Sequence, residues 1–331
     1  MLAGTRDNRD VPSLDVAGLA ERLAPVGISE LEPLVGGASS LTYAGVRDGA
    51  RVVVKVAPPG VEPVRHRDVL RQARVLRSLA SCGVPVPAVL WEDAGAPVEL
   101  PPLFIMTFLE GSSVEPLFDL DGDGTDADVV AERMRDAARV LARLHAIAPS
   151  SVGLADEPVV DARDEVERWA ATLRTVDPTL VPGWEDVAEV LRRSVPAPTP
   201  PAIVHGDFRL GNLLAVDRAV AAVIDWEIWS VGDPRVDLGW FLLNANPDTY
   251  RRPTPYVDAV PPGAELVAVY AGERGHGVPV GLRWFIALAA FKSTATWGLI
   301  VKHNRRREDP DPELEAMADA LPGLLERARD V

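Results

Sequence analysis

Two kinds of apolar pattern divide this chain of 331 residues. Residues 51–56 form a short β-branched run with the length of a strand. The stretch 103–111 is interpreted as a buried strand that ends at a glycine and connects two lobes. Helical spacing follows around residues 265–274, 281–303 and 313–329, with Pro- and Gly-rich breaks between them. The last part of the chain is therefore expected to be a helical subdomain.

Two further apolar runs each end in a polar cluster. Residues 203–204 lead into Asp207, which Asn212 follows five positions later, and residues 223–224 lead into Asp225. Phosphoryl transfer depends mainly on positioning and charge neutralisation, so a few such groups are sufficient. Asp207 is then expected to take the proton of an acceptor hydroxyl. Asn212 and Asp225 would supply the oxygen ligands that Mg²⁺ prefers.

The pattern HGD-x4-N at residues 205–212, followed by IDWE at 224–227, resembles the aminoglycoside phosphotransferase and choline kinase family of small-molecule kinases. The resemblance implies an α+β fold with two lobes, similar to that of protein kinases. A small antiparallel-sheet N-lobe, residues 1–108, would bind the nucleotide, and a larger, mostly helical C-lobe, residues 109–331, would hold the catalytic and substrate-binding residues. It also implies ATP, Mg²⁺ and a small-molecule alcohol as the reaction partners.

The same resemblance indicates a nucleotide site. Residues 34–43 contain a small-residue turn that resembles the family's phosphate-covering loop, although ordinary hairpins also contain such turns. Lys55 is the stronger signal, because a strand seldom buries a charge without a partner. The predicted cofactor-binding residues are Gly36, Gly37, Ser39, Ser40 and Lys55, with Met106, Thr107, Phe108 and Leu109 at the adenine edge.

One position departs from the family pattern. The glutamate that usually pairs with the lysine is replaced by Gln72, and Asp68, one helical turn earlier on the same face, is the alternative partner. This departure keeps open a nucleotide-binding module without useful catalysis. Asp237 is expected to head a helix and to accept hydrogen bonds from the catalytic loop. His205 is expected to brace that loop, with a role as the base as its alternative.

The candidate acceptor contacts are Glu227, Lys292 and Trp297. Lys292 and Trp297 are expected to face one way and to line a pocket, unless the lysine head reaches solvent. Residues 284–292 also resemble the branch of the family that is fused to acyl-CoA dehydrogenases. That branch implies a hydroxyacyl thioester or hydroxy acid as the acceptor.

Charge favours a different acceptor. The first 108 residues carry 11 basic and 12 acidic side chains, whereas the other 223 carry 23 and 37. An acidic C-lobe would attract an amine-bearing alcohol such as an aminoglycoside and is a poor surface for nucleic acid. The same charges are also typical of solvated helices, so both acceptor classes stay open. A protein kinase is disfavoured, because residues 225–237 leave no room for a long activation segment.

The cysteine count and the N-terminal sequence bear on the cellular location of the protein. A single cysteine, Cys82, excludes an internal disulfide, and no charged-then-apolar leader begins the sequence, so a cytoplasmic location is expected. The apolar stretch 281–301 is interrupted by Arg283 and Lys292. It is therefore expected to be a buried helix and not a membrane span.

Overall fold

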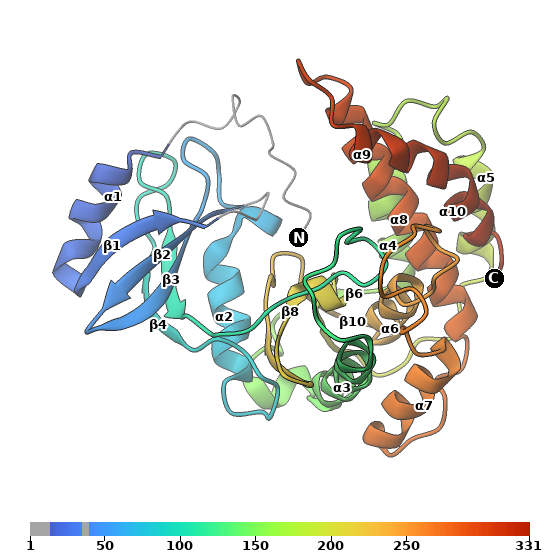
Figure 1. Ribbon diagram of the computed structural model, residues 1–331, viewed down its shortest axis with the longest axis horizontal. Coiled ribbons are helices and arrows are strands. Elements are labelled where there is room, and N and C mark those ends of the chain that lie inside the picture. The colour runs from blue at the N-terminus through green and yellow to red at the C-terminus, as the bar shows by residue number, and fades with distance from the viewer. Residues whose placement is uncertain (1–13, 35–39) are drawn as a thin grey trace.

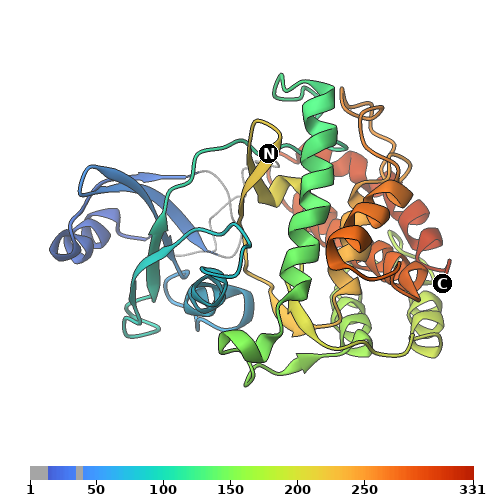
Figure 2. The ribbon, with the colours of Figure 1, turned by 90° about the horizontal axis from the view of Figure 1, so that it is seen from below.

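The computed structural model describes residues 14–34 and 40–331 of the chain. A sheet-containing lobe and a larger helical lobe lie side by side (Figures 1 and 2). This arrangement confirms the predicted α+β fold class. The boundary placed after residue 108 stays a prediction. It lies just beyond the last strand of the smaller lobe, which ends at Thr107.

The N-lobe is built on one five-stranded antiparallel sheet in the order β1-β2-β3-β5-β4. Its strands are β1 (Ile28–Pro33), β2 (Leu41–Arg47), β3 (Ala50–Val56), β4 (Val89–Asp93) and β5 (Leu103–Thr107). Helices α1 (Val16–Leu23) and α2 (Val69–Leu79) accompany the sheet, together with the short 3₁₀ helices η1 (Ala24–Val26) and η2 (Arg65–Arg67).

Alternation along β3 explains how its charge is placed. Val52, Val54 and Val56 are buried in one cluster with Leu19 and Leu23 of α1. Successive strand residues point to opposite faces, so Lys55 points to the other face of the sheet. There its ammonium group meets the side chain of Gln72 on α2.

The C-lobe contains most of the helices. They are α3 (Ala127–Ala146), α4 (Ala162–Leu173), α5 (Trp184–Arg193), α6 (Arg235–Asn244), α7 (Gly263–Arg274), α8 (Leu282–Asn304), α9 (Pro312–Ala316) and α10 (Leu321–Arg327). Three 3₁₀ helices accompany them, η3 (Pro149–Val152), η4 (Leu210–Asn212) and η5 (Met317–Ala320). The short strands β6 (Val159–Val160), β7 (Ala202–Val204) and β10 (Ser230–Gly232) form one sheet, and β8 (Leu213–Val216) pairs with β9 (Ala219–Val223).

Helix α8 lies at the centre of this lobe and packs against α4, α5, α6 and α10. It is long and apolar enough to cross a membrane, but 78% of its most apolar window is buried inside the protein. Gly239 of α6 allows the two helices to approach closely, because a Cβ atom there would lie 2.5 Å from the carbonyl oxygen of Phe285. The helix is thus a core element, as the sequence predicts.

The last helical segment differs from its prediction. The pattern at residues 313–329 suggests one helix, whereas the structure has α9, the 3₁₀ turn η5 and α10 in succession. Pro322 lies at the start of α10. Since proline has no N–H to donate, it favours a new helix start over continuation.

Candidate active site

The catalytic loop follows strand β7 and is held by a buried carboxylate. Asp237, in the first turn of α6, accepts hydrogen bonds from the backbone N–H of His205 at 2.6 Å and of Gly206 at 2.8 Å. Gly206 has a φ of +86°, and a Cβ there would lie 2.6 Å from the carbonyl oxygen of Ile228. Burial raises the pKa of Asp237, but His145 and His205 outweigh it, so the pKa lies below its usual value.

His205 lies under the loop with both ring nitrogens in use. Its Nε2 donates to the carbonyl oxygen of Ile224 at 2.9 Å, and its Nδ1 accepts the backbone N–H of Asp207 at 3.2 Å. Burial lowers the pKa of His205, which favours this neutral form. The contacts support the role of a brace and leave no ring nitrogen aimed at an acceptor.

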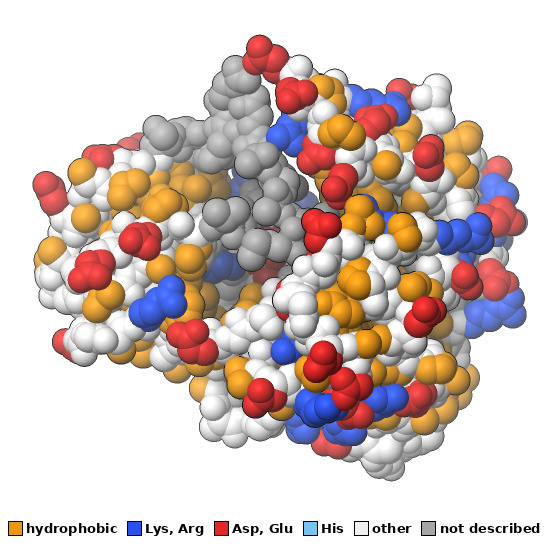
Figure 3. Space-filling model, in the orientation of Figure 1, with side chains coloured by type: hydrophobic (Ala, Val, Ile, Leu, Met, Phe, Trp, Pro, Cys, Tyr) orange, Lys and Arg blue, Asp and Glu red, His pale blue; other side chains and the backbone are white. Residues whose placement is uncertain are grey.

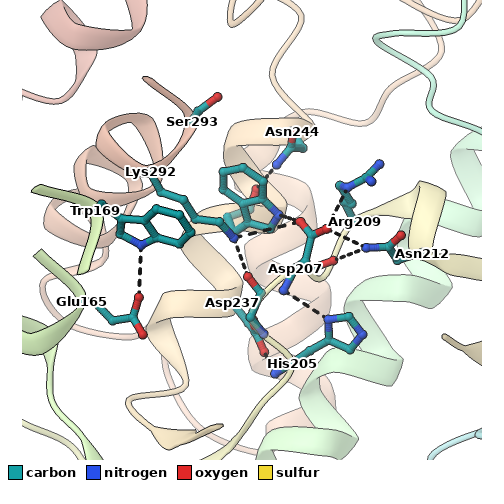
Figure 4. A network of polar contacts seen from close by, with 12 residues as sticks. Glu165, Trp169, His205, Asp207, Arg209, Asn212, Asp237, Asn244, Lys292 and Ser293 are labelled. Carbon is teal, nitrogen blue, oxygen red and sulfur yellow. Dashed lines mark hydrogen bonds and ion pairs between the residues drawn. The ribbon is translucent and has the colours of Figure 1, made fainter. Parts of the chain in front are cut away.

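Asp207 is surrounded by donors (Figure 4). Its Oδ1 accepts from Trp240 Nε1 at 2.7 Å, and its Oδ2 accepts from Asn212 Nδ2 at 2.8 Å and from Arg209 Nε at 3.3 Å. The ammonium group of Lys292 lies 4.0 Å from Oδ1. Burial raises the pKa of Asp207, but Arg209 and Lys292 outweigh it and hold that pKa below its usual value. The carboxylate is ionised and firmly oriented.

The nucleotide side is organised by Lys55. Its Nζ donates to Gln72 Oε1 at 3.1 Å and lies 3.3 Å from Asp225 Oδ1. Asp225 adopts a left-handed conformation, with a φ of +65°, directly after β9. Asp68 instead caps α2 by accepting the backbone N–H of Arg71. Of the two sequence candidates for the partner of Lys55, the structure therefore selects Gln72.

The donor set fits a magnesium ion that is shared with phosphates. Asn212 lies beside the residue before Asp225, because the backbone N–H of Ile224 donates to the carbonyl oxygen of Asn212 at 3.0 Å. The side-chain nitrogen of Asn212 is directed at Asp207, which turns its amide oxygen the other way. In residues 14–34 and 40–331, no group of three His, Cys, Asp or Glu side chains is placed to hold a metal. Mg²⁺ suits such a site, because it takes few protein ligands and keeps phosphate and water oxygens.

The rest of the predicted nucleotide site is only partly described. Gly36, Gly37 and Ser39 lie outside the described residues, whereas Ser40 is buried. At the end of β5, the backbone N–H groups of Thr107 and Phe108 already donate to the carbonyl oxygens of Ala88 and Arg51. Adenine contacts are therefore expected from the neighbouring carbonyl groups and from Met106 and Leu109, and they stay predictions.

The sequence comparisons agree with this geometry. The sequence model of the phosphotransferase enzyme family matches residues 30–271. The chain belongs to that family. This membership supports the predicted enzyme class, a phosphotransferase with an alcohol group as acceptor. Human acyl-CoA dehydrogenase family member 11 is 24% identical to the phosphotransferase over 287 residues, which are 82% of this chain and 36% of that protein. The chain spans about a third of that relative's length.

Solved structures show the same fold. A crystal structure from Ralstonia eutropha, described as a putative aminoglycoside phosphotransferase, aligns with a TM-score of 0.75 at 21% identity, covering 96% of this chain and 98% of that one. A thermostable mutant of aminoglycoside phosphotransferase APH(4)-Ia, in a ternary complex with ADP and hygromycin B, aligns with a TM-score of 0.63 at 17% identity, covering 95% and 99%.

The predicted acceptor residues of the phosphotransferase lie in different places. Lys292 is buried beside Asp207, donates to the carbonyl oxygen of Gly206 and lies 3.6 Å from the ring centre of Trp240. Trp297 instead stacks on Phe118, with ring centres 5.4 Å apart. The expectation that Lys292 and Trp297 share a face is wrong, since five residues turn an α-helix by about 500°, which leaves them roughly 140° apart.

Glu227 and a cavity are two further features of the C-lobe. Glu227 is half-buried in the turn after Asp225, and its acceptor contact stays a prediction. A cavity of about 740 Å³ lies between residues 248–253 and helices α9 and α10. Tyr250 lines this cavity, and its hydroxyl lies 2.8 Å from the hydroxyl of Ser293, the neighbour of Lys292. The volume is typical of small-molecule sites.

Three residues at the site escaped the sequence prediction. Arg209 lies inside the HGD-x4-N pattern and connects Asp207 to the buried carboxylate of Glu115. Burial lowers the pKa of Arg209, but the two carboxylates outweigh it and raise that pKa. Trp240 could have been found from the sequence, because it follows Asp237 by three residues and lies on the same helix. No sequence pattern indicates Glu115, because it is an isolated acidic residue 92 positions before Asp207.

Proposed function

We propose that the protein transfers the γ-phosphoryl group of Mg·ATP to a hydroxyl group of a small molecule. The observation that supports this most is one continuous series of contacts from β3 to the catalytic loop. Lys55 contacts Asp225, the backbone after β9 contacts Asn212, and Asn212 contacts Asp207. The groups that bind phosphate, hold metal and orient an alcohol are thus adjacent.

Each group has a separate task. Lys55 would contact the phosphates, and Asn212 and Asp225 would hold the Mg²⁺ that offsets their charge. The acceptor oxygen forms a bond to the γ-phosphorus while the bond to the bridging oxygen of ADP breaks, and the hydroxyl proton passes to Asp207. A carboxylate with a lowered pKa is a weak base, so Asp207 acts mostly by orienting the hydroxyl.

An amine-bearing alcohol is one candidate acceptor. The C-lobe is acidic overall, and the APH(4)-Ia structure contains hygromycin B. On the face seen in Figure 3, however, acidic side chains of the larger lobe are interspersed with Lys and Arg. Long-range attraction of a cation by that face is therefore smaller than the net charge suggests.

A hydroxyacyl compound or hydroxy acid is the second candidate. Human acyl-CoA dehydrogenase family member 11 is one of the curated relatives. Two cations of the described part of the chain, Arg209 and Lys292, lie within ion-pair distance of Asp207. They disfavour an ammonium group next to the reacting hydroxyl and tolerate a carbonyl or carboxylate oxygen there.

ADP release from Mg·ATP tests the function across aminoglycosides, macrolides, choline-like amines, hydroxy acids and hydroxyacyl-CoA thioesters. Asp207→Asn serves as the blank, and Asp186→Asn, at an exposed position on α5, is the matched control. We expect one acceptor class to give ADP with wild type and with the control, and the blank to lose about 10²–10⁴ in rate.

Wild-type turnover by Asp207→Asn would contradict the assigned role of this carboxylate. Tight binding of Mg·ATP without ADP release for any acceptor would favour a nucleotide-binding module, the alternative that Gln72 motivates. Phosphate incorporation into a mixed-protein substrate would favour a protein kinase.

A further inference from the structure

Lys292 is a buried lysine inside a core helix. The chain has three lysines and 31 arginines. This one lies in the middle of α8 with 8% of its side chain exposed. A buried ammonium group costs free energy unless it is paired and hydrogen-bonded. Its retention at the catalytic loop therefore needs an explanation beyond packing.

The contacts of Lys292 are with the catalytic loop and with aromatic rings. Its Nζ donates to the carbonyl oxygen of Gly206, the residue before Asp207. It also lies 3.6 Å from the ring centre of Trp240. The ring centre of Trp169 is 5.5 Å from Nζ, and both Lys292 and Trp169 are seen in Figure 4. Cation–π attraction of this kind is strongest where water is excluded. The ammonium group is thus fixed in space.

Lys292 and Asp207 form an ion pair without a direct hydrogen bond. The distance of 4.0 Å is too long for a hydrogen bond, and Trp240 Nε1 already donates to Asp207 Oδ1 at 2.7 Å. Beyond this charge attraction, Lys292 acts on Asp207 through two intermediaries. It holds the backbone on one side of the aspartate and the ring of the tryptophan that orients it on the other.

We propose that Lys292 is a positioning residue for the catalytic loop, whose charge fixes Gly206 and Trp240 so that Asp207 is aimed at the acceptor hydroxyl. This inference rests on the proposed phosphoryl transfer. It assigns Lys292 to the alignment of the base and not to a contact with the acceptor.

The charge of Lys292 sets a pH limit on this alignment. Burial is the main cause that lowers its pKa to about 8. The charged groups that act on it are Asp207 on the catalytic loop, Arg168 and Glu165 on α4, and Asp237 on α6. A neutral amine attracts the ring of Trp240 less and bonds the Gly206 carbonyl more weakly. Alignment is therefore lost as the pH rises through about 8.

Steady-state kinetics test the inference. Lys292→Met keeps the length of the side chain and removes its charge, Lys292→Arg keeps the charge, and Lys302→Met is a control on the same helix, where the lysine donates to the carbonyl oxygen of Thr175. We expect Lys292→Met to lower kcat about 100-fold, the effect of a small misplacement, with the KM for ATP unchanged. Lys292→Arg should recover part of kcat, and Lys302→Met should match wild type.

The pH profile separates positioning from a general structural role. Wild-type kcat should fall above pH 8, and Lys292→Arg should stay active to higher pH, because arginine remains protonated. An alkaline fall at the same pH in Lys292→Arg would overturn the inference. So would a Lys292→Met protein whose loss lies entirely in the KM of the acceptor, since that result indicates substrate contact.

A measurement without turnover keeps this test separate from the proposed function. With three lysines, ¹³C-labelled lysine gives three side-chain NMR signals, which Lys292→Met and Lys302→Met assign. We expect the Lys292 signal to titrate near pH 8 in wild type and at a lower pH in Asp207→Asn, which lacks a negative neighbour. A Lys292 signal that titrates near pH 10.5 in both wild type and Asp207→Asn would overturn the inference. Absence of ADP release with the expected titration would contradict only the proposed function.

Discussion

The active site contains two buried lysines that are used in opposite ways. On the nucleotide side, Lys55 makes direct contacts at 3.1 and 3.3 Å with Gln72 and Asp225. On the acceptor side, Lys292 lies 4.0 Å from Asp207 and contacts a backbone carbonyl and tryptophan rings. The comparison shows one cation held by two polar side chains and another held by a backbone carbonyl and aromatic rings.

The partners explain the difference. Gln72 is neutral, so Asp225 is the only carboxylate within ion-pair distance of Lys55 among the described residues. Because a lysine can only donate, it fixes the amide of Gln72 with the oxygen toward Nζ. Gln72 Nε2 is then buried without a partner in the described part of the chain. The nucleotide side thus keeps this one unused donor, whereas on the acceptor side Trp240 and Arg209 both donate to Asp207.

The largest expected effect is a loss of Mg·ATP binding that occurs on replacing Asp225 but not on replacing Asp207. Asp225→Ala should lose Mg²⁺-dependent binding of ATP and about 10³ or more in kcat/KM, because it removes charge neutralisation at the phosphates. Asp207→Asn should lose turnover while it keeps Mg·ATP affinity. Isothermal titration with Mg·ATP gives both affinities. Unchanged affinity in Asp225→Ala would contradict its role as a metal ligand.

Stability against pH probes the acceptor-side lysine. The pKa of Lys292 is about 8 in the folded protein and near its ordinary value of 10.5 when unfolded. Between these values the unfolded chain binds more protons, so the free energy of unfolding should rise with pH. At about 1.4 kcal/mol for each pH unit, the gain is roughly 3 kcal/mol. Denaturant unfolding of wild type and Lys292→Met at pH 7.5 and 10 measures it, and equal pH slopes would contradict it.

Removing the nucleotide-side lysine should affect binding more than alignment. Lys55→Met should weaken Mg·ATP binding about 10- to 150-fold, the equivalent of a charged hydrogen bond worth about 1.5–3 kcal/mol. Lys292→Met should leave this affinity unchanged. Equal losses of affinity in the two variants would remove the distinction between the lysines.

The smallest effect should come from restoring the usual charge at the partner of Lys55. Gln72→Glu adds a negative charge near the phosphates and removes the unpaired amide donor. We expect the Kd of Mg·ATP to rise about 2- to 5-fold, within the range of roughly 1 kcal/mol for one modest charge interaction. A lower Kd would show that pairing of Lys55 outweighs this repulsion.

Short sequence patterns point to several of the candidate residues, whereas residues on the acceptor side lie far apart in the chain. Lys55, Asp207, Asn212 and Asp225 lie in short patterns whose spacing reflects the chemistry. Helical spacing placed Asp68 and Gln72 on one face, but it could not show that Asp68 would cap the helix. Lys292 is 85 residues from Asp207, so only the packing of α8 on α6 reveals their proximity.

The close approach of α6 and α8 at Gly239 limits how α8 can be replaced by the helix of another protein in order to alter acceptor choice. Asp237 and Trp240 flank this glycine on α6, and Phe285, whose carbonyl oxygen it faces, lies seven residues before Lys292 on α8. Any side chain at position 239 would push the two axes apart and draw the lysine away from the tryptophan. A transplanted α8 must therefore keep the spacing of this crossing point as well as Lys292 itself.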